Sequence, residues 1–453
     1  MDGGAINSGT NLTRTLAEQA CAVIYEALPE AVRELARQCV LDYFGVGLAG
    51  ADDELARILL DELAEAGGAE QAGIIGHGAR LPIAAAALVN GAITHALDYD
   101  DVNLAMPGHV SVAILPALLA LAEEKKASGK AVIAAFVAGY ETCCRIGMTM
   151  RPGHYNRGFH ATGTVGAFGA AAACAHLLGL DVEATARALG IAGTQSAGLK
   201  SQFGTMCKPF HAGKAAQNGL LAARLAARGF SSRPDLIECA QGFAGTHSPD
   251  FVPEKALAEP KRGFHIFNNL FKYHAACYMT HAPIECGRQL REQGVAPVEI
   301  AAIKLAAHFA IDQVCNIPAP TDGLEAKFSL RQTVAMALSG VDTASLGAYS
   351  VATATDPALI GLRERVNFDF REDLPEAGAE IEVELKDGRK LGASFDAGIP
   401  MADIAAQGRR LAEKFDALAT PVVGAARARE LRETIAELDA VGDVGVLTRL
   451  AAK

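Results

Sequence analysis

Two features are scarce in this 453-residue chain: tryptophan, of which there is none, and positive charge. Its 41 lysines and arginines are outnumbered by 52 aspartates and glutamates, so the formal net charge is −11. A nucleic-acid-binding protein usually presents a basic face to the phosphates. We therefore predict no nucleic-acid partner. An anionic small-molecule substrate stays compatible with this balance if positive charge is concentrated in the pocket.

Familiar cofactor, metal and transport signals are missing as well. The 10 cysteines are scattered, and none stands in a CxxC pair or at zinc-type spacing. HExxH, GxSxG and a glycine-rich phosphate loop after a strand are absent. The first residues lack the basic segment and apolar core of a signal peptide, and no run of 18 apolar residues predicts a membrane span. We expect free thiols in a reducing cytoplasm, no metal and no membrane contact.

Apolar residues make up 50% of the chain and charged residues 21%, which indicates a folded protein long enough for two domains. Up to about residue 255 the apolar residues recur at helical spacing, and this periodicity predicts a helical bundle with short loops. The predicted helical segments are 10–49, holding two helices, then 54–65, 81–91, 110–124, 129–145, 164–178, 182–190 and 212–228.

The pattern changes near residue 260. Strands are predicted over 298–309, 349–355 and 366–370, and a hairpin over 380–395 turns at Asp387-Gly388. A helix is predicted over 324–338, and two more over 401–417 and 425–438. We therefore predict a mainly α protein with a helical domain over 1–264, a smaller α+β domain over 265–395, and C-terminal helices over 396–453 that return to the helical domain.

The stretch 95–111 combines acids and a histidine between two apolar helices. Asp98, Asp100 and Asp101 follow the first helix, and His109 comes directly after a Pro-Gly break. Catalytic groups collect on loops that a rigid scaffold holds, so we predict that these side chains face a cavity. The alternative is an acidic cap cluster on a surface turn, with His109 near a helix start.

Three other segments carry histidine or lysine. His160 lies in a short stretch before a Gly- and Ala-rich helix, and Lys272 lies near the domain boundary. Lys208 precedes a helix expected to start at Pro209, where the helix dipole disfavours a cation, so an anionic partner explains it better. For Arg157 a solvated surface role is an equal alternative. Histidines, lysines and acids together suit proton transfer beside carboxylates.

These motifs resemble those of the MmgE/PrpD family, which includes 2-methylcitrate dehydratase, cis-aconitate decarboxylase and iminodisuccinate epimerase. The resembling motifs are DxDD…GH over 98–109, RGFHxTG over 157–163, KPFHAGKAAQNG over 208–219, FKYHAACYMTHAPIE over 271–285 and AKFSL over 326–330. The resemblance implies a large helical domain built from both chain ends, a smaller α+β lid domain, a homodimer, and no metal or organic cofactor.

The resemblance also implies site residues. The expected catalytic residues are Asp98, His109, His160, Lys208 and Lys272. The expected substrate-binding residues are Asp101, Arg157, Gln202, His211 and Tyr273.

Some positions depart from the family pattern. Val102 stands where threonine is usual, and Val110 stands where proline usually follows the histidine. A lid tyrosine of some members has no match, since the nearest region, 312–318, offers Gln313 and Cys315. These departures leave the individual substrate open.

The reactions of this family share a carbanion or proton transfer beside a carboxylate. We expect first a metal-independent hydro-lyase, similar to 2-methylcitrate dehydratase, that acts on a small di- or tricarboxylate. The alternatives are an epimerase similar to iminodisuccinate epimerase and a decarboxylase of the cis-aconitate type. A non-catalytic carboxylate binder would need the lysines but not both His109 and His160 in their motif positions, which argues against that class.

Overall fold

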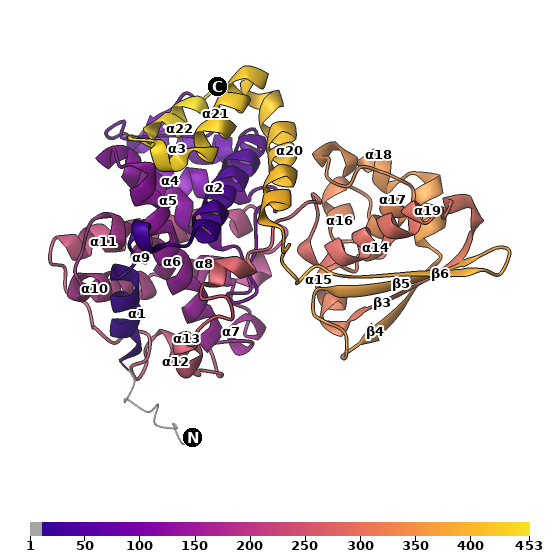
Figure 1. The fold of residues 1–453 in the computed structure, drawn as a ribbon, viewed down its shortest axis with the longest axis horizontal. Coiled ribbons are helices and arrows are strands. Elements are labelled where there is room, and N and C mark those ends of the chain that lie inside the picture. Colours follow the sequence, from indigo (N-terminus) through magenta and orange to yellow (C-terminus); the bar gives the residue numbers. More distant parts are fainter. Residues whose placement is uncertain (1–10) are drawn as a thin grey trace. The chain divides into compact units, whose positions relative to one another are not determined.

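The computed structural model describes residues 11–453, apart from the side chain of Gln313. Thr10, where the first predicted helix begins, lies outside this range. The described residues form two compact units (Figure 1). The helical unit contains residues 11–271 and Met401–Lys453, and the mixed unit is Lys272–Pro400. Both chain ends therefore belong to one helical unit.

The helical unit is a bundle with one two-residue ladder, β1 (Ala72–Gly73) against β2 (Arg80–Leu81). Its α-helices are α1 (Leu12–Cys21), α2 (Glu30–Gly50), α3 (Glu54–Ala66), α4 (Ile83–His95), α5 (Val110–Lys125), α6 (Gly129–Thr149), α7 (Gly153–Asn156), α8 (Ala161–Thr164), α9 (Gly166–Leu177), α10 (Val182–Gly193), α11 (Cys207–Ala227), α12 (Phe243–His247), α13 (Glu254–Leu257), α20 (Ile404–Val423), α21 (Ala425–Ala436) and α22 (Gly445–Leu450). Short 3-10 turns join them, among them η2 (Lys200–Gln202), η3 (His265–Asn268) and η8 (Leu438–Ala440).

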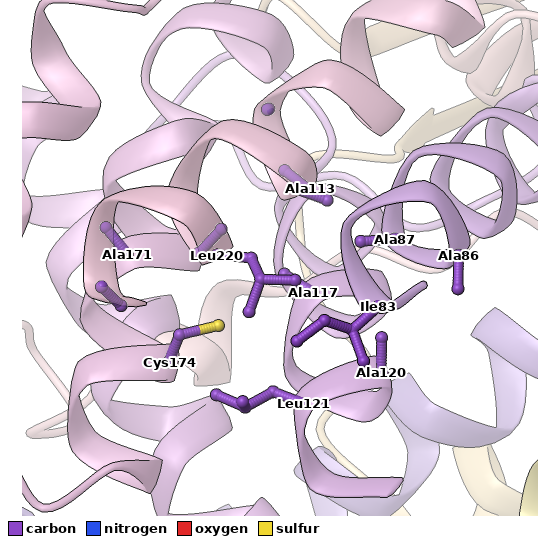
Figure 2. Close-up of a cluster of buried hydrophobic side chains, with 14 of the residues drawn as sticks. Ile83, Ala86, Ala87, Ala113, Ala117, Ala120, Leu121, Ala171, Cys174 and Leu220 are labelled. Carbon is purple, nitrogen blue, oxygen red and sulfur yellow. The ribbon is translucent and has the colours of Figure 1, made fainter. Parts of the chain in front are cut away.

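Small side chains set the core between α4, α5, α9 and α11. Figure 2 shows alanines of α4, α5 and α9 near Leu121, Cys174 and Leu220, the last of which comes from α11. A Cβ placed on Gly91 would lie 2.7 Å from the Cα of Gly213, so α4 and α11 touch through their backbones. Close packing of this kind makes a rigid frame. The ends of α4 and α5 that this frame holds are the ends that carry the acid- and histidine-rich stretch.

The C-terminal helix α20 lies beside α2, where Figure 1 draws them in yellow and indigo. The Gln407 side-chain amide donates to Gln38 at 2.9 Å, and the Gln38 amide in turn donates to the Ile404 carbonyl at 2.9 Å. Phe415 packs against Gly45, where an added Cβ would lie 3.2 Å from its ring. These contacts confirm that the chain's tail returns to the helical unit.

Helix α6 is the most apolar long helix of the described chain. By length and composition it could cross a bilayer, but 89% of its apolar window is buried inside the protein. Core helices of folded domains commonly have this character. Its apolar run is interrupted by Glu141 and Arg145, so the sequence alone predicted no membrane span here.

The mixed unit contains a four-stranded sheet in the order β4-β3-β5-β6. Strand β3 pairs parallel to β4 and antiparallel to β5, and β5 pairs antiparallel to β6. Gly388, at a φ of +86°, allows the tight turn of the predicted hairpin. The elements are η4 (Tyr278–Thr280), α14 (His281–Glu292), η5 (Pro297–Glu299), β3 (Ile300–His308), η6 (Phe309–Ile311), α15 (Asp312–Cys315), α16 (Gly323–Lys327), α17 (Leu330–Leu338), η7 (Leu346–Ala348), α18 (Val351–Ala354), α19 (Pro357–Arg363), β4 (Val366–Arg371), β5 (Gly378–Leu385) and β6 (Lys390–Asp396).

Three local predictions are wrong. The strand predicted over 349–355 is helix α18, because the Ser350 hydroxyl accepts from the Thr353 N–H and starts a helical turn. The helix predicted over 324–338 is two helices, since Ser329 caps α17 in the same way. Helix α11 begins at Cys207, before Pro209, so Lys208 lies inside its first turn instead of ahead of it.

The domain limits also differ from 265 and 395. Residues 265–271 stay with the helical unit, because the Glu141 carboxylate accepts the backbone N–H groups of His265 and Ile266, and Leu270 pairs with Val102. At the other limit, the Ala397 carbonyl accepts a hydrogen bond from the Tyr278 hydroxyl at 2.5 Å, which holds the residues after β6 in the mixed unit.

Candidate functional site

The candidate site is built on the turn between α4 and α5. His95 is the last residue of α4, and His109 is the residue directly before α5. Between them Asp98 has a φ of +52°, a left-handed conformation that is uncommon for any residue except glycine. Strained backbone of this kind collects at functional sites. The His109 N–H donates to the Thr162 hydroxyl at 3.0 Å, which ties the turn to α8.

Asp100 lies between two imidazoles at the base of this site. Its carboxylate oxygens are 2.9 and 3.1 Å from the Nδ1 of His95. The Nδ1 of His109 is 3.0 Å from the Asp100 Oδ2, but its direction makes this contact electrostatic and not an aligned hydrogen bond. Burial opposes ionisation of Asp100, yet the imidazoles of His109 and His95 outweigh it and hold the pKa of this carboxyl well below its usual range. Asp100 is therefore a fixed negative charge.

Asp98 is the meeting point of a lysine and a histidine. The Lys208 Nζ donates to the Asp98 Oδ1 at 2.8 Å, and the His109 Nε2 lies 3.4 Å from the same oxygen. The side chains of Asp98 and Lys208 keep 17% and 13% of their exposure, so solvent or a small ligand can reach them. Lys208 also lies 5.2 Å from the centre of the Phe203 ring. Residues 98 and 208 come together although 110 positions separate them.

A second pair of histidines flanks this centre. His160, directly before α8, has its Nδ1 3.1 Å from the Nδ1 of His211 on α11. Its ring stacks at 5.9 Å on that of His95 and meets Phe203 edge-on at 5.0 Å. Burial lowers the pKa of His160 well below its ordinary value, and burial also lowers the pKa of His211. A contact between two ring nitrogens needs one N–H and one lone pair, so the accepting ring is neutral, and burial favours the neutral form of both rings.

His95 is a further neutral imidazole. Burial lowers its pKa to about 4 although Asp100 opposes this shift. Its ring lies 4.4 Å from that of His109. The structure therefore joins His95, Asp100, His109, Asp98 and Lys208 in one cluster.

Asp101 points into a separate buried network. Its Oδ2 accepts from the Ser111 hydroxyl at 2.5 Å and from the Asn269 amide at 2.9 Å. Burial raises the pKa of Asp101 to about 6 against these donors. Asp101 has no exposed surface, so its contacts support the turn from within the protein. Its expected substrate contact stays a prediction.

Two other predicted binding residues lie in exposed positions. Arg157 donates to the Thr246 carbonyl at 3.2 Å, and Gln202 accepts from the Thr205 hydroxyl at 3.3 Å. No described contact joins either of them to the cluster. Lys272 and Tyr273 begin the mixed unit, and their roles stay predictions.

The cluster also meets the geometric requirement for a cation site. One ligand atom from each of His95, Asp98, Asp100 and His109 lies within 4.8 Å of the others. Two imidazoles and two carboxylates suit a divalent transition metal. However, the Lys208 ammonium already contacts Asp98, and Asp100 is shared between imidazoles. The prediction of no metal rested on sequence spacing, which does not detect ligands brought together by a turn.

Asp100 was predicted from the sequence to face a cavity but was given no catalytic or binding role, and His95 was not predicted as a site residue. His95 ends a helix of buried residues, where a polar ring without a partner would be costly. The presence of Asp100 five positions after His95 was the one sequence signal that His95 has a partner. The spacing of five matches no helical or strand face, so only the turn geometry shows the pair.

Two family models match the chain. The MmgE/PrpD N-terminal domain matches residues 14–256, and the MmgE/PrpD C-terminal domain matches residues 274–440. A relative from Aspergillus terreus, named cis-aconitate decarboxylase, is 27% identical over 479 residues that cover 98% of this chain and 96% of the relative. A relative of the same name from Homo sapiens is 28% identical over 379 residues that cover 80% of this chain and 78% of the relative.

Proposed function

Since the chain belongs to the MmgE/PrpD family, we propose that it is a lyase that acts on a small di- or tricarboxylate through a carbanion beside a carboxylate. The observation that carries this proposal is the meeting of Lys208 and His109 at one oxygen of Asp98, with the buried charge of Asp100 behind His109. This arrangement puts a fixed cation and a proton-transfer group within reach of one small ligand.

The residues divide the chemistry in the following way. Lys208 binds a substrate carboxylate and offsets the negative charge that develops on it in the transition state. His109 moves a proton at its Nε2, the nitrogen that lies nearest to Asp98. Asp100 stabilises the charged form of the His109 ring while that ring holds the proton. Asp98 holds Lys208 in place before the substrate arrives.

Decarboxylation of an unsaturated tricarboxylate is the first candidate reaction. In cis-aconitate the bond from the CH2 carbon to its carboxyl group breaks, and CO2 leaves. The released electron pair forms a new double bond, and the former double-bond pair moves to the carbon beside another carboxylate, where it accepts one proton. The step needs one positioned acid and one cation, and the relatives named cis-aconitate decarboxylase support this choice.

Dehydration of a hydroxylated acid such as 2-methylcitrate is the second candidate. Here one group removes a proton beside a carboxylate and another protonates the departing hydroxyl, so that water leaves. The second histidine, His160, favours this alternative, because dehydration needs a second proton-transfer group and the His160 ring stacks on that of His95 beside the cluster.

One NMR experiment in D2O separates these reactions. The protein is incubated with cis-aconitate, with 2-methylcitrate and with a panel of other small polycarboxylates, and a His109→Gln variant serves as control. We expect CO2 release with one deuterium at the new CH2 group, absent in the variant. Water loss instead would select the dehydratase, and exchange without net conversion would select an epimerase. If no acid of the panel is converted and none exchanges a proton for deuterium, the lyase proposal is refuted.

A further inference from the structure

A lysine from the far end of the chain contacts the backbone of the catalytic turn. The Lys414 Nζ, on α20, donates to the Tyr99 carbonyl at 2.8 Å and to the Asp42 Oδ1 on α2 at 2.6 Å. It also lies 3.9 Å from the centre of the Tyr99 ring. Tyr99 is the residue between Asp98 and Asp100, so the contact falls at the middle of the site.

This lysine is held in a buried position. The side chains of Lys414 and Asp42 keep only 7% and 2% of their exposure. Burial raises the pKa of Asp42 to about 7, and Lys414 opposes that shift. Burying an ion pair is seldom a net gain in stability over well-packed apolar side chains. Its hydrogen bond to a carbonyl in the turn gives the pair another role.

We propose that Lys414 is a positioning residue that fixes the catalytic turn by holding the Tyr99 carbonyl. The peptide group that carries this carbonyl joins Tyr99 to Asp100, and the preceding residue, Asp98, has the left-handed backbone. Rotation of that peptide would move Asp100 away from the imidazoles and would let Asp98 relax. The C-terminal helix α20 therefore completes the site of the helical unit. The role of Lys414 in turnover rests on the proposed lyase function. The hydrogen bond from Lys414 to the Tyr99 carbonyl, here called the clamp, is a property of the fold.

A merely structural role for Lys414 is the alternative, and the chain offers a matched control. Arg37 lies on α2, the helix that carries Asp42, and pairs with Asp439 of η8 at 2.9 Å. Like Lys414, it therefore ties α2 to the C-terminal part of the helical unit, residues 401–453. Its side chain keeps 11% of its exposure. No described contact joins Arg37 to the turn. Arg37→Met therefore removes a comparable attachment without releasing the Tyr99 carbonyl.

The kinetic test compares Lys414→Met, Lys414→Arg and Arg37→Met by kcat, KM and melting temperature. We expect Lys414→Met to lose about tenfold to a hundredfold in kcat, since a displacement of about 1 Å in a catalytic group costs this much. Lys414→Arg, which can still donate to the carbonyl, should recover part of the loss. Arg37→Met should keep kcat within about threefold of the wild type, even if its melting temperature falls as much as that of Lys414→Met.

A double variant distinguishes the lost carbonyl contact from an unpaired buried charge. If Lys414→Met is slow only because Asp42 is left unpaired, then adding Asp42→Asn should restore kcat. The clamp predicts that the double variant stays as slow as Lys414→Met, and that Asp42→Asn alone is milder. Recovery in the double variant, or equal losses in Lys414→Met and Arg37→Met, would overturn the proposal.

The ring nitrogens report on the clamp without any substrate. Imidazole ¹⁵N resonances of His95 and His109, assigned with His95→Gln and His109→Gln, should shift in Lys414→Met and keep their positions in Arg37→Met. If the wild type converts none of the acids, the lyase proposal fails while this measurement still decides the clamp. Unchanged resonances in Lys414→Met would refute it.

Discussion

Replacing Asp100 with asparagine removes the charge at the base of the cluster and keeps the size of the side chain. In the wild type this carboxylate is 2.9 Å from the Nδ1 of His95 and 3.0 Å from the Nδ1 of His109. The amide oxygen of asparagine can still accept from His95. What the variant loses is the negative charge that stabilises His109 while that ring holds a proton.

The loss can be estimated from the distance. Two unit charges 3.0 Å apart attract by about 5 to 6 kcal/mol at an effective dielectric constant of about 20. Since each 1.36 kcal/mol is about tenfold in rate, this sets an upper limit of about 10⁴-fold on kcat. Asp98, which lies 3.4 Å from the Nε2 of His109, remains and supplies part of the stabilisation. We therefore expect Asp100→Asn to lower kcat by about 10²- to 10³-fold.

The assay is steady-state kinetics on the substrate that the NMR panel selects, with the melting temperature measured in parallel. Glu141→Gln is the control, because Glu141 is a buried carboxylate of the same unit that accepts two backbone N–H groups away from the cluster. It should keep kcat within about threefold of the wild type. A folded Asp100→Asn enzyme with a kcat equally close to the wild type would refute the role given to this charge.

Further predictions concern binding, metals and pH. Lys208→Ala should raise KM about tenfold to a hundredfold, since a charge-assisted hydrogen bond to a substrate carboxylate is lost, and a change in kcat alone would contradict this. Activity should survive dialysis against EDTA, whereas loss that added metal restores would mean that the cluster around Asp98 binds a required cation. Burial raises the pKa of Glu141 from 4.5 to about 7, so the fold favours its neutral form and the wild type loses stability as pH rises through this window. Glu141→Gln lacks this loss, so its unfolding free energy relative to the wild type should increase by about 2 to 3 kcal/mol between pH 5 and pH 8. Urea unfolding at both pH values measures this difference, and a difference that stays constant would contradict the raised pKa of Glu141.

The fold was largely accessible from local patterns. Helical spacing of apolar residues predicted the long helices, and the Asp387-Gly388 turn predicted the hairpin of β5 and β6. Residues 349–355 form a helix instead of the predicted strand, because Ser350 and Thr353 form a helix cap that apolar periodicity does not detect. Local signals fail where a single side-chain hydrogen bond decides between strand and helix.

The site was less accessible, because its contacts are distant in the sequence. Nothing near Asp98 indicates that Lys208 will reach it. The residues alone predicted a cavity at Asp98 and an anionic partner for Lys208, and only the family resemblance put both in one site. Lys414 shows the same limit more strongly, since it contacts Tyr99 from 315 positions away. The apolar periodicity of α20 predicts that this helix packs on the helical unit, but it does not predict which carbonyl accepts a hydrogen bond from Lys414.

The central claim is that His109 transfers the proton in this site, and that His160 is the second proton-transfer group if the reaction is a dehydration. The most direct test measures kcat, melting temperature and deuterium incorporation for His109→Gln and His160→Gln. We predict that both variants fold, and that His109→Gln loses about 10²- to 10⁴-fold in kcat and incorporates deuterium correspondingly more slowly. His160→Gln should lose as much where water is the leaving group. Near-native kcat and deuterium incorporation in both folded variants would contradict the account and leave the two histidines as packing or capping residues.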